Sequence, residues 1–273
     1  MFKKKGFKKL SAFFAVPMAV LFAVIGCMMA DASFPSTDVS AEPETYNESF
    51  DVNASLYTEG YSLYDPEEYI ESRYDCVSIE ESVSYMLDDW SYSSQNQLNA
   101  YYNAQNDASV SGTCGVVACT SIVYYYATVK GYTDIPADKN TLFAKLIDYY
   151  GITDGEGTSS SSYKKAIPWL FSEYGYSMSA SRATLVNKYT KMKAKAEDGI
   201  PTEFSTSGTE RYGSHAMVVV GYRTYTITYM DGSEEKTETE TYYALDEGWG
   251  QNKPAYAMQG NMPGSWEITT LED

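Results

Sequence analysis

The hydrophobic periodicity of this chain changes near Ile200, and that change limits the folds that it can adopt. Before that point, segments with helical spacing or good helix formers are found at 113–129, 139–150, 163–174 and 183–198. After it, Val, Tyr and Thr alternate or run together as they do in strands, at 200–204, 216–229, 236–245 and 266–270. Helices followed by antiparallel strands predict an α+β domain, which we place at 95–273, with a helical layer packed on a sheet.

The first 32 residues have the layout of a secretory signal peptide. Five lysines precede an apolar run, 10–25, which is shorter than the roughly 20 residues of a membrane span. Small residues at 30–32 favour cleavage before Ser33, and the Val-Ile-Gly-Cys sequence ending at Cys27 resembles a lipobox. We favour the first site. The sequence therefore predicts a secreted, extracellular protein, or a cell-surface lipoprotein if Cys27 is lipidated.

An acidic segment, 33–94, separates this leader from the predicted domain. Its first part, 33–53, consists of Ser, Thr, Pro and acidic residues without apolar periodicity, which is typical of a flexible spacer. Between Glu42 and Trp90 there are fourteen acidic residues and a single base, Arg73. We interpret the segment as an acidic spacer and an N-terminal arm. A propeptide that masks a site is the alternative, to which we give less weight.

Charge and histidine content exclude several kinds of function. The net charge of −17 repels nucleic acid and anionic lipid, so we expect neither as a partner, and no membrane contact beyond a lipid anchor at Cys27. The single histidine, His215, excludes a His-rich metal site, and we expect no metal and no cofactor. We expect a monomer that acts on a peptide or protein substrate.

Cys114 lies where a loop is predicted to become a helix, in the Gly-Thr-Cys-Gly sequence at 112–115. The first turn of a helix offers unpaired N–H groups and positive potential, and both stabilise a thiolate, the reactive form of cysteine. A small buried cysteine that closes the helix explains this motif equally well.

His215 and Asp246 lie at the two ends of a predicted hairpin. His215 enters the apolar sequence 216–220 directly after Gly and Ser, and Asp246 precedes Gly-Trp-Gly at 248–250. The ends of a hairpin are close in space, so Asp246 can accept a hydrogen bond from His215 and leave the other ring nitrogen for a thiol. A structural histidine and a turn-capping aspartate are the alternatives. Together with Cys114, the pair fits a Cys-His-acid arrangement for nucleophilic catalysis.

These motifs resemble those of papain-like cysteine peptidases, in the bacterial branch that includes the bacteriocin-leader (double-glycine) peptidase-like domains and streptopain. The resemblance extends from about Gln105 to Trp266. It is carried by Gly-x-Cys-Gly around Cys114, by Gly-x-His-Ala followed by a valine-rich strand and Gly-Tyr at 213–222, and by Asp246 before Gly-Trp-Gly.

The resemblance implies a papain-like fold and a role for each matched residue. Cys114 would be the nucleophile, His215 the general base and then acid, and Asp246 the residue that orients the imidazole. Gln105 would donate its side-chain amide to the oxyanion, alongside the backbone N–H of Cys114. The gap of 101 residues between Cys114 and His215 is shorter than the roughly 130–150 typical of papain itself. Cys119 is a rival nucleophile, although its position inside the helix favours packing.

Two other functions and one covalent feature stay open. The 27 tyrosines suit a surface-binding module that keeps the fold without turnover, because tyrosines supply rigid contact area. The same three residues also suit acyl transfer to an amine, as in transglutaminase-like enzymes. A disulfide between Cys76 and Cys119 would leave Cys114 free.

Overall fold

The computed structural model describes residues 65–152, 158–183, 187–209, 212–262 and 264–272, which all belong to one compact unit, Asn47–Asp273. The expected signal peptide, the lipobox at Cys27 and the spacer lie outside the described residues. Among the helices described, none is long and apolar enough to cross a membrane.

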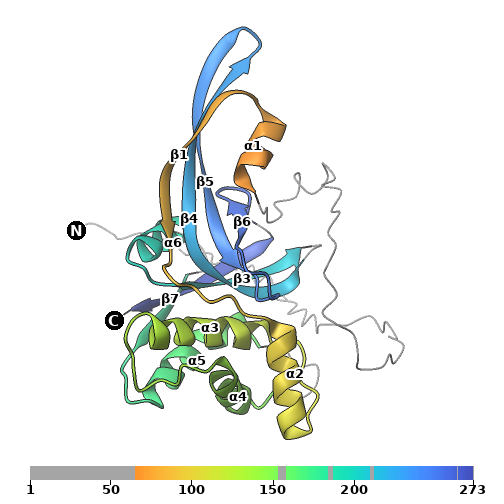
Figure 1. The fold of residues 1–273 in the computed structure, drawn as a ribbon, viewed down its shortest axis with the longest axis vertical. Helices are drawn as coiled ribbons and strands as arrows, with labels where there is room; N and C mark the ends of the chain where they lie inside the picture. Colours follow the sequence, from red (N-terminus) through yellow and green to blue (C-terminus); the bar gives the residue numbers. More distant parts are fainter. Residues whose placement is uncertain (1–64, 153–157, 184–186, 210–211, 263, 273) are drawn as a thin grey trace, which may run out of the picture. The chain divides into compact units, whose positions relative to one another are not determined.

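A layer of four helices forms one side of the domain (Figure 1). In chain order they are α2 (Gln95–Asn106), α3 (Cys114–Thr128), α4 (Lys139–Tyr150) and α5 (Ser160–Ser172). Eleven residues of α3 are buried, which makes it the central helix of the layer. Asp138 caps the start of α4, and Gly151 ends it in the left-handed conformation. The predicted helix at 163–174 begins earlier, at Ser160, and continues through Pro168.

The strands of the described residues form one antiparallel sheet in the order β2-β7-β3-β4-β5-β6, with β1 also paired to β4. Their bounds are β1 (Asp75–Met86), β2 (Ser179–Ala183), β3 (Thr202–Thr209), β4 (Gly213–Asp231), β5 (Glu234–Asp246), β6 (Ala255–Met258) and β7 (Ser265–Glu272). The predicted strands at 200–204, 216–229, 236–245 and 266–270 correspond to β3, β4, β5 and β7. Helices and an antiparallel sheet confirm the α+β prediction.

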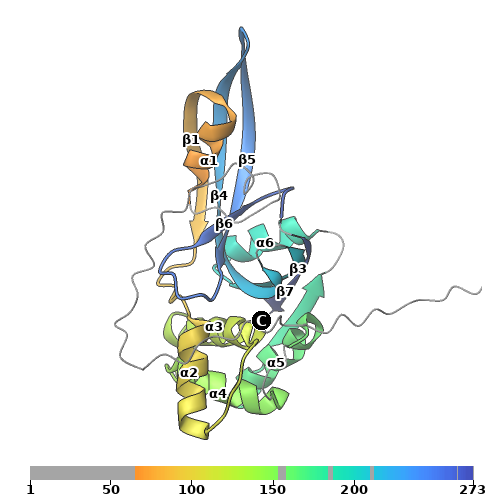
Figure 2. The same cartoon turned by 90° about the vertical axis from the view of Figure 1, so that its right-hand side faces the viewer.

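The sheet has a hydrophobic core on each face. Alternate residues of β4 divide between them, with Ala216 and Val218 packed toward α3–α5, and Met217 and Val219 packed toward α6 (Lys188–Glu197). Figure 2 shows α6 across the sheet from α3. Because α3 covers one face of the sheet, its N-terminal residue, Cys114, lies against β4.

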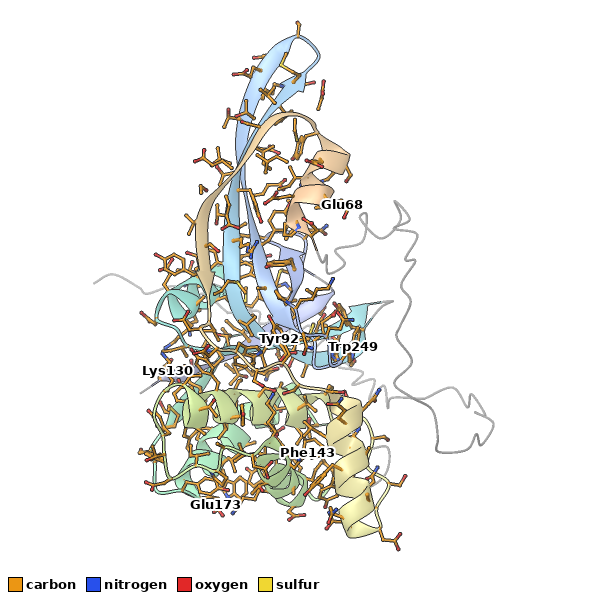
Figure 3. The ribbon with its side chains drawn as sticks, in the orientation of Figure 1. Glu68, Tyr92, Lys130, Phe143, Glu173 and Trp249 are labelled. Atoms are coloured by element: carbon orange, nitrogen blue, oxygen red, sulfur yellow. The ribbon has the colours of Figure 1, made fainter. Side chains whose placement is uncertain are left out.

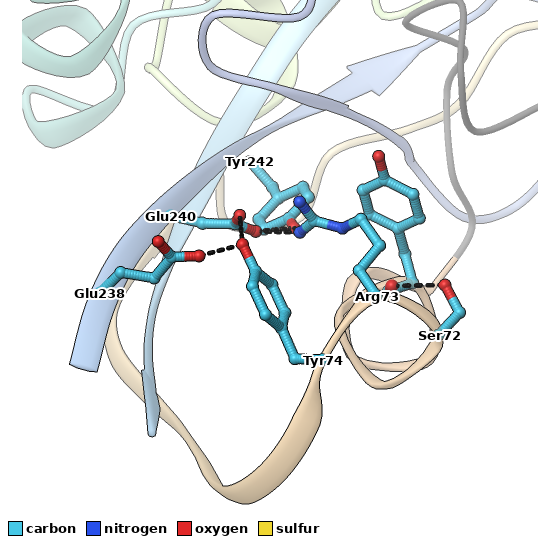
Figure 4. Close-up of polar contacts among 7 residues, drawn as sticks. Ser72, Arg73, Tyr74, Glu238, Glu240 and Tyr242 are labelled. Carbon is cyan, nitrogen blue, oxygen red and sulfur yellow. Dashed lines mark hydrogen bonds and ion pairs between the residues drawn. The ribbon is translucent and has the colours of Figure 1, made fainter. Parts of the chain in front are cut away.

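An arm made of α1 (Pro66–Arg73) and β1 lies along the part of the β4–β5 hairpin that α3 does not cover (Figure 1). Arg73 anchors it, because the guanidinium pairs with Glu240, donates to the Tyr242 hydroxyl at 3.1 Å and stacks on the Tyr69 ring at 4.2 Å. The Tyr74 hydroxyl also donates to Glu240 at 3.0 Å (Figure 4). The arm is therefore tied to the sheet by strand pairing and by a largely buried ion pair.

Replacing Arg73 with alanine is expected to lower the free energy of unfolding by about 2–4 kcal/mol, because Glu240 is only 6% exposed and would lose its cation. Lys145→Ala removes the cation of an exposed pair with Glu173 and should cost less than about 1 kcal/mol. Urea denaturation of both variants measures the difference. Equal losses would show that the Arg73 cluster does not anchor the arm.

Replacing Gly221 with alanine is expected to lower the free energy of unfolding by about 3–5 kcal/mol. An added Cβ would lie 2.2 Å from the Tyr85 carbonyl oxygen and 2.9 Å from the Met86 Cα, so β1 would have to move away from β4. Gly260→Ala is the control, since its Cβ meets nothing within 4 Å and its positive φ alone costs about 1–2 kcal/mol. Similar losses in the two variants would contradict the close approach of β1.

Candidate active site

Cys114 is the first residue of α3 and is partly exposed. The backbone N–H groups of Ala216 and Gly115 lie beside its sulfur and lower the pKa of the thiol. Burial raises the pKa of the Cys114 thiol, and these N–H groups oppose that rise only in part. The sequence predicted a thiolate stabilised by the helix start, whereas in the structure desolvation is the larger effect. Ionisation of Cys114 therefore needs a base that takes the proton and leaves a cation beside the sulfur.

The Ala216 N–H beside the sulfur also brings Cys114 near the chain's histidine, because His215 is the preceding residue of β4. His215 is 8% exposed. Its ring stacks on Tyr212, with centroids 5.6 Å apart and planes 2° from parallel, and its centroid lies 5.0 Å from that of the Trp249 ring. Trp249 lies where the sheet meets the helical layer (Figure 3). The two aromatic rings restrict the orientation of the imidazole.

One imidazole nitrogen has a partner that fixes the position of its proton. His215 Nε2 lies 2.8 Å from the backbone carbonyl oxygen of Glu247. A carbonyl oxygen only accepts, so Nε2 carries the proton in this contact. In the neutral ring, Nδ1 then holds the lone pair, as a general base requires.

Asp246 pairs with Val218 across β4 and β5 and is 4% exposed. Its Oδ1 accepts from the Gly248 N–H at 2.9 Å, and its Oδ2 accepts from Trp90 Nε1 at 3.0 Å. Burial raises the pKa of Asp246, and these two donors partly oppose the rise. The bond to Gly248 closes a turn around Glu247, whose carbonyl contacts His215. The sequence predicted that the Asp246 carboxylate itself would contact the imidazole, and this direct contact stays a prediction.

The segment before α2, residues 91–94, packs against the Gly-Trp-Gly turn near His215. Lys139 Nζ donates to the Tyr92 carbonyl and to the Ser93 hydroxyl, both at 2.9 Å. Ser94 forms an isolated bridge with Trp249, and the N–H of Gly250 donates to the Ser93 carbonyl at 3.0 Å. These bonds hold the Gly-Trp-Gly turn against the helical layer. Tyr92 and Trp249 accordingly lie between the layers (Figure 3).

Gln105 is exposed near the C-terminal end of α2. Two side chains of α2 reach the loop before Cys114. Asn99 Oδ1 accepts from the buried Thr113 hydroxyl at 2.6 Å, and Asn103 Oδ1 accepts from the Val110 N–H at 2.8 Å. Six residues of helix separate Asn99 from Gln105, about 9 Å along the axis. The role of Gln105 as an oxyanion donor stays a prediction, and Asn99 and Asn103 are contacts of the loop that sequence reasoning missed.

Gly115 leaves room for a tyrosine behind Cys114. A Cβ at Gly115 would lie 2.1 Å from the Tyr163 hydroxyl oxygen and 2.3 Å from the Thr158 hydroxyl oxygen. Tyr163 is buried in α5, and its hydroxyl lies 3.2 Å from the Thr158 carbonyl, to which it donates. Sequence reasoning did not anticipate this close approach of Tyr163 to Gly115.

The other two cysteines of the described residues, Cys119 and Cys76, lie in different environments from Cys114. Cys119 is 0% exposed, and burial raises its pKa well above the ordinary value. Cys76 lies on β1 of the arm. All three cysteines in the described part of the chain are free, so the structure does not contain the disulfide between Cys76 and Cys119 that the sequence allowed. Within the described ranges, no group of three or more His, Cys, Asp or Glu residues could hold a metal ion.

A buried helix that starts with a cysteine, packed on an antiparallel sheet with a histidine near the start of a central strand, is consistent with a papain-like cysteine peptidase fold. The model of the Peptidase_C39 like family matches residues 87–262, more than half of the chain. The chain belongs to this family, and membership points to a cysteine-type peptidase, a hydrolase. No curated protein matches the chain.

Proposed function

We propose that this protein is an exported cysteine peptidase that hydrolyses peptide bonds through an acyl-enzyme on Cys114. The observation that carries the proposal is the approach of the Ala216 N–H to the Cys114 sulfur, because Ala216 directly follows His215 on β4. The tautomer that the Glu247 carbonyl imposes on the imidazole gives the base the lone pair that it needs.

In the proposed reaction, His215 Nδ1 takes the thiol proton and the Cys114 sulfur attacks the carbonyl carbon of the peptide. The tetrahedral intermediate places negative charge on the former carbonyl oxygen, where the Cys114 N–H and Gln105 would donate. The imidazolium then gives its proton to the leaving amine as the C–N bond breaks. Water, deprotonated by His215, attacks the thioester and releases the carboxylic acid and the thiol.

Asp246 would act on His215 from the neighbouring strand. Its bonds to Gly248 and Trp90 hold the turn that presents the Glu247 carbonyl to the imidazole. A direct carboxylate–imidazole bond would have the same effect on the tautomer. Either way, Asp246 orients the base and takes no proton.

The remaining expectations complete the proposal. The resemblance to the double-glycine leader peptidase and streptopain branch favours a peptide or protein as the substrate. The apolar run and the lysines of residues 1–32 support export, with a lipid anchor if Cys27 is processed. The net charge of −17 opposes nucleic-acid binding, and a monomer is sufficient for this site.

The binding-module alternative loses its main support, because the tyrosines largely build the core. The largest fully buried side chains include Tyr222, Tyr225, Tyr242 and Tyr243. Acyl transfer to an amine keeps the same site and differs only in the acceptor that attacks the thioester.

Digestion of a proteome-derived peptide library by the full exported chain tests the proposal, with Cys114→Ala as the inactive control. We expect new termini that the control does not produce. In water enriched in heavy oxygen, hydrolysis labels each new carboxylate, whereas transfer to an added amine gives an unlabelled amide. Identical peptide patterns from the wild type and the control would refute peptidase activity.

A further inference from the structure

A buried acid that the proposed reaction does not use lies beneath the nucleophile. Glu203 is a residue of β3 and is 0% exposed. Its Cα is paired with Val218 of β4 on one side and with Thr269 of β7 on the other. Val218 packs in the core under α3, so Glu203 shares the sheet face that the cysteine helix covers.

The hydrogen bonds of this carboxyl group are unequal. Its Oε1 accepts from the Ser205 hydroxyl, and the Thr269 hydroxyl also donates to the group. Its Oε2 is buried and has no hydrogen-bond partner among the described residues. In the buried interior, an ionised carboxylate with an unpaired oxygen is strongly unfavourable, whereas a neutral carboxylic acid costs much less. Burial accordingly raises the pKa of Glu203 to about 8.

Titratable and charged groups on five neighbouring elements interact electrostatically with Glu203. They are Cys114 and Cys119 of α3, Tyr150 of α4, Tyr163 of α5, Arg182 of β2 and Glu267 of β7. The cation in this set, Arg182, is paired with Glu267. A negative charge on Glu203 would therefore face the Cys114 sulfur without a cation of its own, and it opposes ionisation of that thiol.

We propose that Glu203 is a positioning residue for the nucleophile: as a neutral acid it supports the start of α3 on β3, and its ionisation suppresses the Cys114 thiolate. This rests on the proposed role of Cys114. The consequence is an alkaline limit on the reactivity of Cys114, set by a residue that does not touch the substrate.

The test is the rate of iodoacetamide alkylation of Cys114, mapped by mass spectrometry between roughly pH 6 and 9. If only the Cys114 thiol titrated, the alkylation rate would rise with pH along a single titration curve. In the wild type, ionisation of Glu203 should make the rise at higher pH less steep than this curve. Glu203→Gln, which cannot ionise, should match the wild type within about twofold near pH 6 and exceed it by about threefold or more near pH 9. Glu203→Met, neutral and of similar size, should behave in the same way.

Glu240→Gln is the matched control, because Glu240 is a buried acid of the same sheet that pairs with Arg73 in the arm. It should leave the alkylation profile unchanged even if it lowers the melting temperature. A wild-type profile that fits a single thiol titration overturns the proposal, whatever the variants do. So do superimposable profiles of Glu203→Gln and the wild type. Alkylation requires no peptide cleavage, so it tests the role of Glu203 even if the peptide digestion shows that the protein is not a peptidase.

Discussion

Replacing Cys114 with alanine is expected to lower kcat/KM for peptide hydrolysis by at least about 10⁴-fold, because it removes the sulfur on which we propose that the thioester forms. Cys119→Ala is the matched variant, because Cys119 lies further along the same helix. The Cys119 side chain is fully enclosed, and burial raises the pKa of its thiol well above the ordinary value. Its removal should change kcat/KM by less than about threefold, beyond a small loss of stability from the cavity.

These two variants decide between the cysteines that the sequence offered as nucleophiles. Steady-state kinetics at matched protein concentration measures the effect, and circular dichroism confirms that both variants are folded. If Cys119→Ala lost activity while Cys114→Ala retained it, the nucleophile would be misassigned. Retention of activity in both would refute thiol catalysis.

Replacing His215 should lower kcat/KM by about 10³- to 10⁴-fold at neutral pH, because the chain has no other histidine to serve as a base. Burial raises the pKa of Cys114, so without imidazole the thiol stays protonated until the solution is alkaline. We therefore expect any residual activity of His215→Ala to rise with pH, where the wild type shows a neutral optimum.

His215→Phe separates the chemistry of the imidazole from its packing. A phenyl ring can still pack against Tyr212 and Trp249, but it has no nitrogen to accept the thiol proton. This variant should unfold near the wild-type temperature and be as inactive as His215→Ala. More than about a tenth of wild-type activity in His215→Phe would show that the ring has only a structural role.

The sequence predicted those helices and strands whose own residues favour one type of secondary structure. The run around Ile122 is apolar, contains no Pro and ends before Gly131, and the residues after His215 are rich in valine; α3 and β4 lie there. The short strands β2 and β6 were missed, because Ser179–Ala183 and Ala255–Met258 have little period of their own. Each becomes a strand by pairing with β7 or β5.

Part of the site could be predicted from local sequence. Cys114 and His215 each lie in a glycine-containing motif, and hairpin geometry suggested that Asp246 lies near His215. The partner of the imidazole seen in the structure, the Glu247 carbonyl, is a backbone atom, which side-chain patterns do not reveal. Glu203 was equally invisible, because its burial depends on strand order and on α3 covering that face.

The most direct measurement of the central claim is the mass of the acyl-enzyme. A peptide ester acylates a thiol peptidase faster than the thioester is hydrolysed, so acid quenching during turnover should trap the intermediate. We predict one acyl group per molecule, located on Cys114 after digestion of the quenched protein, and none in Cys114→Ala. An unmodified Cys114 in a protein that hydrolyses the ester, or an acyl group on any other residue, would contradict the assignment.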